Sequence, residues 1–287
     1  MKKLVLTSVL ALAVIAGCAH KHDENDGLAK DGSLGSNESL LVDDGNEAND
    51  VEEDVEGGVE DPLSGSEVGD PGTPADGATD DEVMGKVRKN PGLFFQPAGC
   101  ITTTVEGNKA THVFNDCTGP RGILHFNGTI VSTYTREPGK LTIKHQATDF
   151  HINGATISGE RVVVYTRSGA VVTKTRDGNW TGATKKGNPI SHTASFQTTW
   201  NAMTKCITRD GAATTSVGNR EFDWSISNFK RCGIGQLGCP ESGTVTLSRT
   251  KGDRTASVTI EFIGGPNVRI TGPRGGQVTS KLVCRAN

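Results

Sequence analysis

The chain has 287 residues and a formal net charge of −3, with 34% hydrophobic and 5% aromatic residues. This near-neutral total conceals two regions of opposite charge. Ala19 to Gly85 contains 21 Asp and Glu against two Lys, a net charge of −19, whereas the stretch from Lys86 onward has 26 Lys and Arg against 12 Asp and Glu, a net charge of +14. The division excludes one uniform globular domain and predicts an acidic unfolded segment joined to a basic folded domain.

The first 17 residues have the pattern of a secretory signal peptide. Met1-Lys2-Lys3 precedes an apolar run from Leu4 to Ile15, and about 12 residues are too few for a transmembrane helix, which needs roughly 20. The run ends Ile15-Ala16-Gly17-Cys18. This ending resembles the lipobox of bacterial lipoproteins, which implies cleavage before Cys18 and acylation of that cysteine, for example with palmitate. The alternative is an ordinary signal peptide whose cysteine is incidental.

The residues after Cys18 indicate where the lipid anchor would lie. Ala19 stands where an aspartate would retain a lipoprotein at an inner membrane, so we expect attachment to the outer membrane of a two-membrane bacterium. The stretch Lys21-His22-Asp23-Glu24 resembles the acidic signals that send some lipoproteins to the cell surface. The sequence leaves open whether the protein is on the periplasmic or the cell-surface face.

Residues 18–78 combine the lipidated cysteine with a linker of low complexity. The stretch VDDGNEANDVEEDVEGGVEDPLSGSEVGDPGTPADGATDD is rich in Gly, Asp and Glu and lacks aromatic residues, so it cannot bury enough apolar surface to offset its ordering entropy. We predict a disordered tether. It acts either as a solubilising spacer or as an electrostatic element that folds back on the basic domain and competes with an anionic partner.

Residues 79–287 predict one basic, all-β domain that begins with a short helix. Thr79 can cap a helix over 80–89, which Asn90-Pro91-Gly92 ends. Apolar residues then alternate with polar ones, as in TASVTIEFI, EFDWSIS and GTVTLSR, and such alternation is typical of half-buried antiparallel strands. Three dipeptides favour hairpin turns, namely Asn153-Gly154, Asp177-Gly178 and Asp210-Gly211. We expect roughly a dozen strands in an antiparallel meander that forms a sandwich or an open barrel.

Cysteine usage supports an oxidising compartment. Without Cys18 an even number remains, which suggests up to three disulfides. Sequence alone allows 15 pairings of six cysteines, and we expect Cys100–Cys117, Cys232–Cys239 and Cys206–Cys284. Their spacing does not suit a zinc site. The disulfide candidates are Cys100, Cys117, Cys206, Cys232, Cys239 and Cys284.

Two stretches carry a resemblance to a known group of proteins. FNDCTGPRGILHFNGTI (Phe114 to Ile130) and YTREPGKLTIKHQATDFHINGATISGERVV (Tyr134 to Val163) resemble uncharacterised, Bacteroidetes-like β-rich surface lipoproteins. The similarity covers about residues 115–250 and implies a surface location and a β architecture, but no activity. In those relatives, the cysteine at a KRC sequence is matched by a second cysteine some way downstream. Here Lys230-Arg231-Cys232 is present, but Cys239 follows early.

Candidates for chemistry are sparse. Gly233-x-Gly235-x-x-Gly238 matches a dinucleotide fingerprint without the following helix that the motif needs, so we interpret it as a disulfide-closed turn. On a regular strand His145, Asp149 and His151 would share one side and could hold a metal; the alternative is an exposed polar face. We find no nucleophile motif in the β domain and expect no cofactor. Paired carboxylates such as Glu221 and Asp223 would suit a carbohydrate-active hydrolase.

Basic residues form the remaining signal. A domain of this charge attracts polyanions, and we therefore favour a non-catalytic cell-envelope module, either binding or structural, with an anionic polymer or a partner protein as ligand. Lipopolysaccharide, acidic exopolysaccharide and extracellular DNA are the polyanions considered, with nucleic acid the least favoured. The alternative is the hydrolase. The polyanion-binding candidates are Arg161, Arg167, Lys174, Arg176, Lys230, Arg231, Arg249, Lys251 and Arg254.

Overall fold

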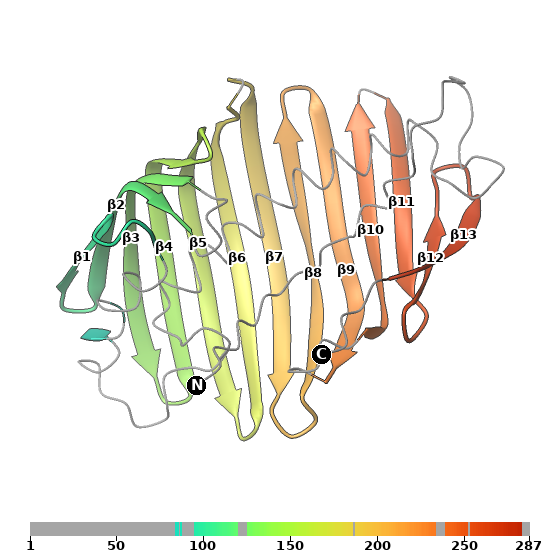
Figure 1. Ribbon diagram of the computed structural model, residues 1–287, viewed down its shortest axis with the longest axis horizontal. Coiled ribbons are helices and arrows are strands. Elements are labelled where there is room, and N and C mark those ends of the chain that lie inside the picture. Colours follow the sequence, from blue (N-terminus) through green and yellow to red (C-terminus); the bar gives the residue numbers. More distant parts are fainter. Residues whose placement is uncertain are drawn as a thin grey trace.

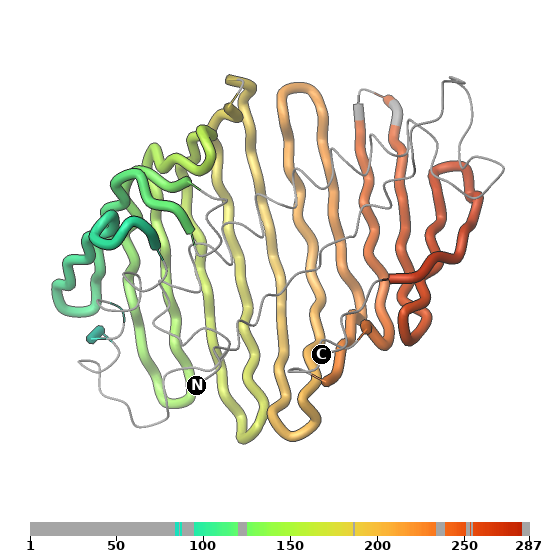
Figure 2. The backbone as a smooth tube through the Cα atoms, in the orientation of Figure 1, coloured from blue at the N-terminus to red at the C-terminus, as the bar shows by residue number. Residues whose placement is uncertain are grey.

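The computed structural model describes residues 84–85, 87, 95–119, 125–185, 187–233, 239–251 and 253–282. These residues form a single antiparallel sheet of 13 strands that follow one another in chain order, with β1 and β13 at its two open edges (Figure 1). The chain runs up and down through the sheet (Figure 2). The predicted all-β antiparallel meander is therefore confirmed. Its strands form one open sheet instead of two packed sheets.

The strands are longest in the middle of the sheet and shorten toward β13. Their bounds are β1 Ile101–Glu106, β2 Lys109–Thr118, β3 His125–Glu137, β4 Lys140–Ile152, β5 Ala155–Ser168, β6 Val171–Ala183, β7 Pro189–Asn201, β8 Cys206–Val217, β9 Arg220–Cys232, β10 Pro240–Lys251, β11 Arg254–Phe262, β12 Asn267–Thr271 and β13 Gln277–Lys281.

Alternation of apolar and polar residues explains why one face of the sheet is apolar. Successive side chains of a strand point to opposite faces, and Val258, Ile260 and Phe262 of β11 are buried as their spacing predicts. The buried residues of the other strands join them on the same face, which we call the inner face. We call the opposite one the outer face.

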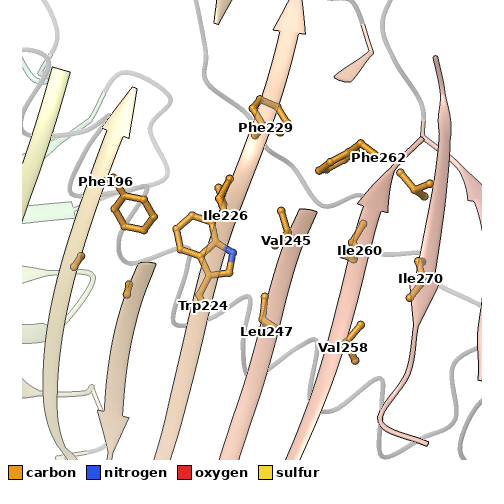
Figure 3. Packing of buried hydrophobic residues seen from close by; sticks show 13 residues of the cluster. Phe196, Trp224, Ile226, Phe229, Val245, Leu247, Val258, Ile260, Phe262 and Ile270 are labelled. Carbon is orange, nitrogen blue, oxygen red and sulfur yellow. The ribbon is translucent and has the colours of Figure 1, made fainter. Parts of the chain in front are cut away.

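The inner face carries three apolar clusters. One spans β7–β12 and includes Phe196, Trp224 and Ile260 (Figure 3). A second contains four phenylalanines that form five ring pairs with centroids 5.1–6.1 Å apart, namely Phe95, Phe114, Phe126 and Phe150. The third lies on β2–β5 and is covered by Met84 and Val87. Met84, Gly85 and Val87 are helical, so the described part of the predicted 80–89 helix is confirmed and packs on the inner face.

Only one of the three Asn-Gly and Asp-Gly dipeptides forms the predicted turn. Asn153 and Gly154, with φ of 49° and 85°, connect β4 to β5 as a two-residue hairpin turn does. Asp177-Gly178 instead lies in the middle of β6, and Asp210-Gly211 lies within β8 at a β-bulge. These two predictions were wrong because both glycines leave room for a side chain of a neighbouring strand. At Gly211 the ring of Phe196 on β7 is so close that a Cβ would sit 2.4 Å from Phe196 Cδ1.

The disulfides correct two of the three predicted pairings. Cys100–Cys117 is present as predicted. Cys206, however, bonds to Cys232, because the start of β8 and the end of β9 are register partners. The predicted pairs Cys232–Cys239 and Cys206–Cys284 are therefore wrong. Cys239 is also disulfide-bonded, and Cys284 lies outside the described residues.

Several predictions concern parts of the chain that the structure does not describe. The signal peptide (1–17), Cys18, the acidic linker (18–78) and most of the Gly233–Gly238 stretch lie outside the described residues.

Candidate functional site

Charged residues are sorted between the two faces of the sheet. Within the described strands, Asp and Glu occur only on the outer face or at register shifts, and those at register shifts are Asp116, Asp149, Asp210 and Glu241. Cations occur on both faces, but those of the inner face are interleaved with the apolar clusters. The inner cations, assigned by strand alternation and register, include Arg136, Arg161, Arg167, Lys174, Arg176, Arg209, Arg220, Arg231 and Arg249. The inner face is therefore cationic and apolar at once.

Three of these arginines are among the buried residues of the domain. Arg161 on β5, Arg176 on β6 and Arg209 on β8 expose 5%, 2% and 8% of their surface. Their register partners on the next strand are Gly178 for Arg161, Phe196 for Arg176 and Phe229 for Arg209. The three arginines therefore occupy neighbouring cross-strand rows of side chains on the inner face. A buried guanidinium must be compensated by anions or aromatic faces.

Aromatic rings supply part of that compensation. The guanidinium carbons of Arg176 and Arg209 lie 5.0 and 4.9 Å from the centroid of Phe196, and Arg209 is 5.7 Å from the centroid of Trp224. The rings of Phe196 and Trp224 are themselves 4.9 Å apart (Figure 3). Such cation–π contacts hold a guanidinium flat over a ring. We call Arg161, Arg176, Arg209, Phe196 and Trp224 the arginine–aromatic patch.

Three buried histidines lie on the inner face, each hydrogen-bonded to a hydroxyl of a neighbouring strand. His112 Nδ1 is 3.0 Å from Thr103 Oγ1, His145 Nδ1 is 2.8 Å from Ser132 Oγ, and His192 Nδ1 is 2.8 Å from Thr215 Oγ1. Burial, followed by the nearby His145, lowers the pKa of His112 to about 3. His112 is therefore neutral near pH 7 and adds no charge to the inner face.

A small apolar cavity adjoins Arg161. Its volume is about 50 Å³, which exceeds the roughly 10–15 Å³ that one water needs. Its walls include Phe150, Ile157 and Trp180, and Arg161 and His145 also line it. An apolar group linked to an anion fits this combination of walls and charge.

The outer face has a different electrostatic character. Its cations pair with half-exposed carboxylates, as in Lys144–Glu160, Lys230–Glu241 and Arg269–Glu261, each 2.8 Å apart. Glu221 and Asp223 also lie on this face, beside Phe222 and Trp224, which are buried on the other. Asp223 accepts hydrogen bonds from Thr214, at 2.8 Å, and from Ser248, at 3.4 Å. The structure thus places this carboxylate pair away from the patch.

The predicted polyanion-binding residues divide between the faces. Arg161, Arg167, Lys174, Arg176, Arg231 and Arg249 occupy inner positions. Lys230 lies on the outer face, in its ion pair with Glu241. Lys251 and Arg254 pair at the β10–β11 hairpin, but their side chains are outside the described part of the structure. Sequence reasoning missed Arg209, because the adjacent Asp210-Gly211 resembles a turn.

The predicted His/Asp/His set is not brought together. A bulge at Asp149, where φ is 47°, shifts the alternation of β4. His145 is consequently buried on the inner face, whereas His151 is exposed and lies 3.2 Å from Thr156 Oγ1. Across the described residues, the structure contains no group of three or more His, Cys, Asp or Glu that could hold a metal ion.

Comparisons with known proteins identify no relative of the chain: no protein-family model, curated protein or solved structure matches it. The resemblance to β-rich lipoproteins accordingly remains a proposal. Among the residues that the structure describes, no helix is long and apolar enough to cross a membrane.

Proposed function

We propose that the protein is an outer-membrane lipoprotein whose β domain is a non-catalytic module that binds an anionic polysaccharide of the cell envelope. The arginine–aromatic patch on the inner face carries this proposal. Guanidinium groups bind carboxylate, phosphate and sulfate in a two-pronged geometry, and the rings of Phe196 and Trp224 hold Arg176 and Arg209 through cation–π contacts. The signal peptide and Cys18 of the sequence support attachment to the membrane by lipid.

The position of the acids favours binding over hydrolysis. A glycosidase needs two carboxyl groups that face the bound sugar, roughly 5–10 Å apart. Within the described strands the inner face carries arginines, whereas Glu221 and Asp223 belong to the outer face. A site on the inner face of this kind holds an anionic polymer without cleaving it.

The experiment is a titration of the delipidated full chain with dextran sulfate, lipopolysaccharide and duplex DNA at 50 and 300 mM salt. A second protein, which we call the neutralised variant, carries Asn or Gln in place of the ten Asp and Glu between residues 43 and 61 and so weakens competition from the chain's own acids. We expect binding of dextran sulfate and lipopolysaccharide that weakens at least tenfold between the two salt concentrations. Failure of both proteins to bind any of these polymers at 50 mM salt would overturn the proposal and favour a protein partner. Tighter binding of DNA than of the other two polymers would make nucleic acid, instead of a polysaccharide, the proposed ligand.

A further inference from the structure

We infer that the small cavity of the inner face, between β3 and β6, is a site for an acetyl group, so that the polysaccharide ligand is one that carries acetyl groups beside its acidic groups. The inference rests on the proposed function for the class of polymer, and it adds the substituent that the protein recognises.

Two small residues, side by side in one cross-strand row, create the cavity. The register partners of this row run from Ile130 on β3 through Ala147 on β4 and Gly159 on β5 to Trp180 on β6. All four residues line the cavity. Ile130 and Trp180 are large and buried at the two ends, whereas Ala147 and Gly159 between them are half-buried and leave the space of two larger side chains unfilled.

The backbone determines that part of this row carries no side chain. A Cβ at Gly159 would collide with the carbonyl oxygen of Asn179 and would lie 2.5 Å from the Cα of Trp180, so another residue does not fit at this point of β5. On β4, a register shift directly follows Ala147, and the next side chain on the inner face is that of Phe150. The gap therefore follows from the close approach of the strands and from the bulge.

The size of the cavity selects a small substituent. Its volume of about 50 Å³ corresponds to roughly three to five water-sized groups. An acetyl group, which consists of a carbonyl and a methyl group, is of this size. A whole sugar ring or a long acyl chain is too large to enter.

The two sides of the cavity differ in chemistry. Phe150 and Ile157 are register partners on one side, and His145 and Arg161 are register partners on the other. The first pair is apolar and suits a methyl group, which leaves water when it packs there. Arg161 has several N–H donors, so it can donate to a carbonyl oxygen of the ligand in addition to its contacts within the protein. An acetyl group matches both sides together.

Arg161 also joins the cavity to the site of the proposed function. It lines the cavity and belongs to the arginine–aromatic patch, so the acetyl site and the acidic site are contiguous. A polymer whose acidic groups lie along the patch therefore brings its neighbouring substituents to the cavity.

The experiment compares alginate with the same alginate after O-acetylation of its hydroxyls, because the two polymers have the same carboxylates. The delipidated full chain is titrated with each polymer at 50 mM salt. We expect the acetylated polymer to bind at least fivefold more tightly. Ala147→Leu fills the cavity with a larger side chain, and it should bind both polymers equally, with the affinity that the unmodified chain has for plain alginate.

Ala256→Leu is the matched control. Ala256 is also a half-buried alanine that packs on the apolar inner face, but it lies on β11 and does not line the cavity, so this variant should keep the fivefold preference. Ile130→Val covers the case that Ala147→Leu misfolds. It removes a methylene group from one end of the cavity and should shift the preference from O-acetylated alginate to O-propionylated alginate, whose acyl group is longer by one methylene.

N-methylacetamide, an acetyl amide without charge or sugar, separates this inference from the proposed function. It should shift the indole N–H resonance of Trp180, assigned with Trp180→Phe, in the unmodified chain and not in Ala147→Leu. This shift without binding of any polymer would support the acetyl site and overturn polysaccharide binding. Equal binding of both alginates by the unmodified chain, or a full acetyl preference in Ala147→Leu, would overturn the acetyl site and leave the proposed function intact. Neither a shift nor binding of any polymer would overturn both.

Discussion

The side chain of Arg161 on β5 lies across its register partner Gly178 on β6, where a Cβ would meet Arg161 Nε at 3.0 Å and Cγ at 3.2 Å. A glycine in the middle of a long strand costs conformational entropy. At this position it leaves the space that the buried side chain of Arg161 occupies on the inner face.

Gly178→Ala should therefore displace Arg161. We expect a loss of stability of about 1 kcal/mol from overpacking and a loss of dextran sulfate affinity of at least threefold in the neutralised variant. Gly85→Ala is the control, because nothing lies within 4 Å of a Cβ there and alanine favours a helix by about 1 kcal/mol. Thermal unfolding and titration of both variants make the comparison. Unchanged affinity in Gly178→Ala would show that Arg161 does not take part in binding.

The alternation of side chains between the two faces of a strand is the feature that the sequence could predict. Alternation at Val258, Ile260 and Phe262 identified a strand and its buried face, and Arg161 is two residues before Val163 and four before Tyr165, which already places it on their apolar face. Alternation is interrupted at bulges. The extra residue at Asp149 separates His145 from His151. Arg209 keeps the alternation of Ala213 and Thr215 along β8, and it was missed because the neighbouring Asp210-Gly211 has the sequence of a turn.

Other features depend on which strands become neighbours, which local patterns do not encode. Gly178 and Gly211 belong to dipeptides typical of turns, but both lie within strands, where the side chains of Arg161 and Phe196 from adjacent strands lie against them. Disulfide pairing follows in the same way from the register of β8 and β9, which places Cys206 opposite Cys232.

The buried His112 predicts acid sensitivity. Its pKa is about 3 in the folded protein, against 6.5 for an ordinary histidine, so only the unfolded chain takes up this proton as the pH falls below about 6.5. Folding stability should consequently decrease toward acid by up to about 1.4 kcal/mol per pH unit from this group. His112→Gln can keep the contact with Thr103 and cannot titrate.

Urea unfolding at pH 7.0 and 5.5 measures this effect. The difference in unfolding free energy between the two pH values should be about 1 kcal/mol smaller for His112→Gln than for the unmodified chain. His125→Gln, which alters an exposed residue at the start of β3, serves as the control and should behave like the unmodified chain. An identical pH dependence for His112→Gln would contradict the assignment.

The Cys206–Cys232 disulfide should stabilise the β8–β9 hairpin. It joins residues 26 apart in sequence, for which the loop-entropy relation gives about 3.5 kcal/mol. Cys206→Ala with Cys232→Ala should lower the unfolding free energy by about that amount, as measured by urea unfolding without reductant. Non-reducing peptide mapping of the unmodified chain supplies the second check. Recovery of a Cys232–Cys239 peptide in place of Cys206–Cys232 would show that the pairing is different.

The proposed lipid anchor predicts a simple dependence on Cys18. Cys18→Ser should abolish labelling with a palmitate analogue and release the protein from the membrane fraction. Ala19→Asp is the matched variant, which should retain the label and move the protein from the outer to the inner membrane. Continued labelling of Cys18→Ser would place acylation elsewhere and remove the basis for the anchor.

The most direct test of the account compares two charge-removing pairs in the neutralised variant. One pair is Arg176→Gln with Arg209→Gln on the inner face, and the other is Lys144→Gln with Lys230→Gln on the outer face. Both remove two positive charges, so net charge alone affects them equally. The measurement is the dissociation constant for dextran sulfate at 50 mM salt, with near-ultraviolet circular dichroism to confirm folding. We predict at least a tenfold loss of affinity for the inner pair and less than a twofold change for the outer pair. Equal losses would contradict a site on the inner face and leave only general attraction by the basic domain.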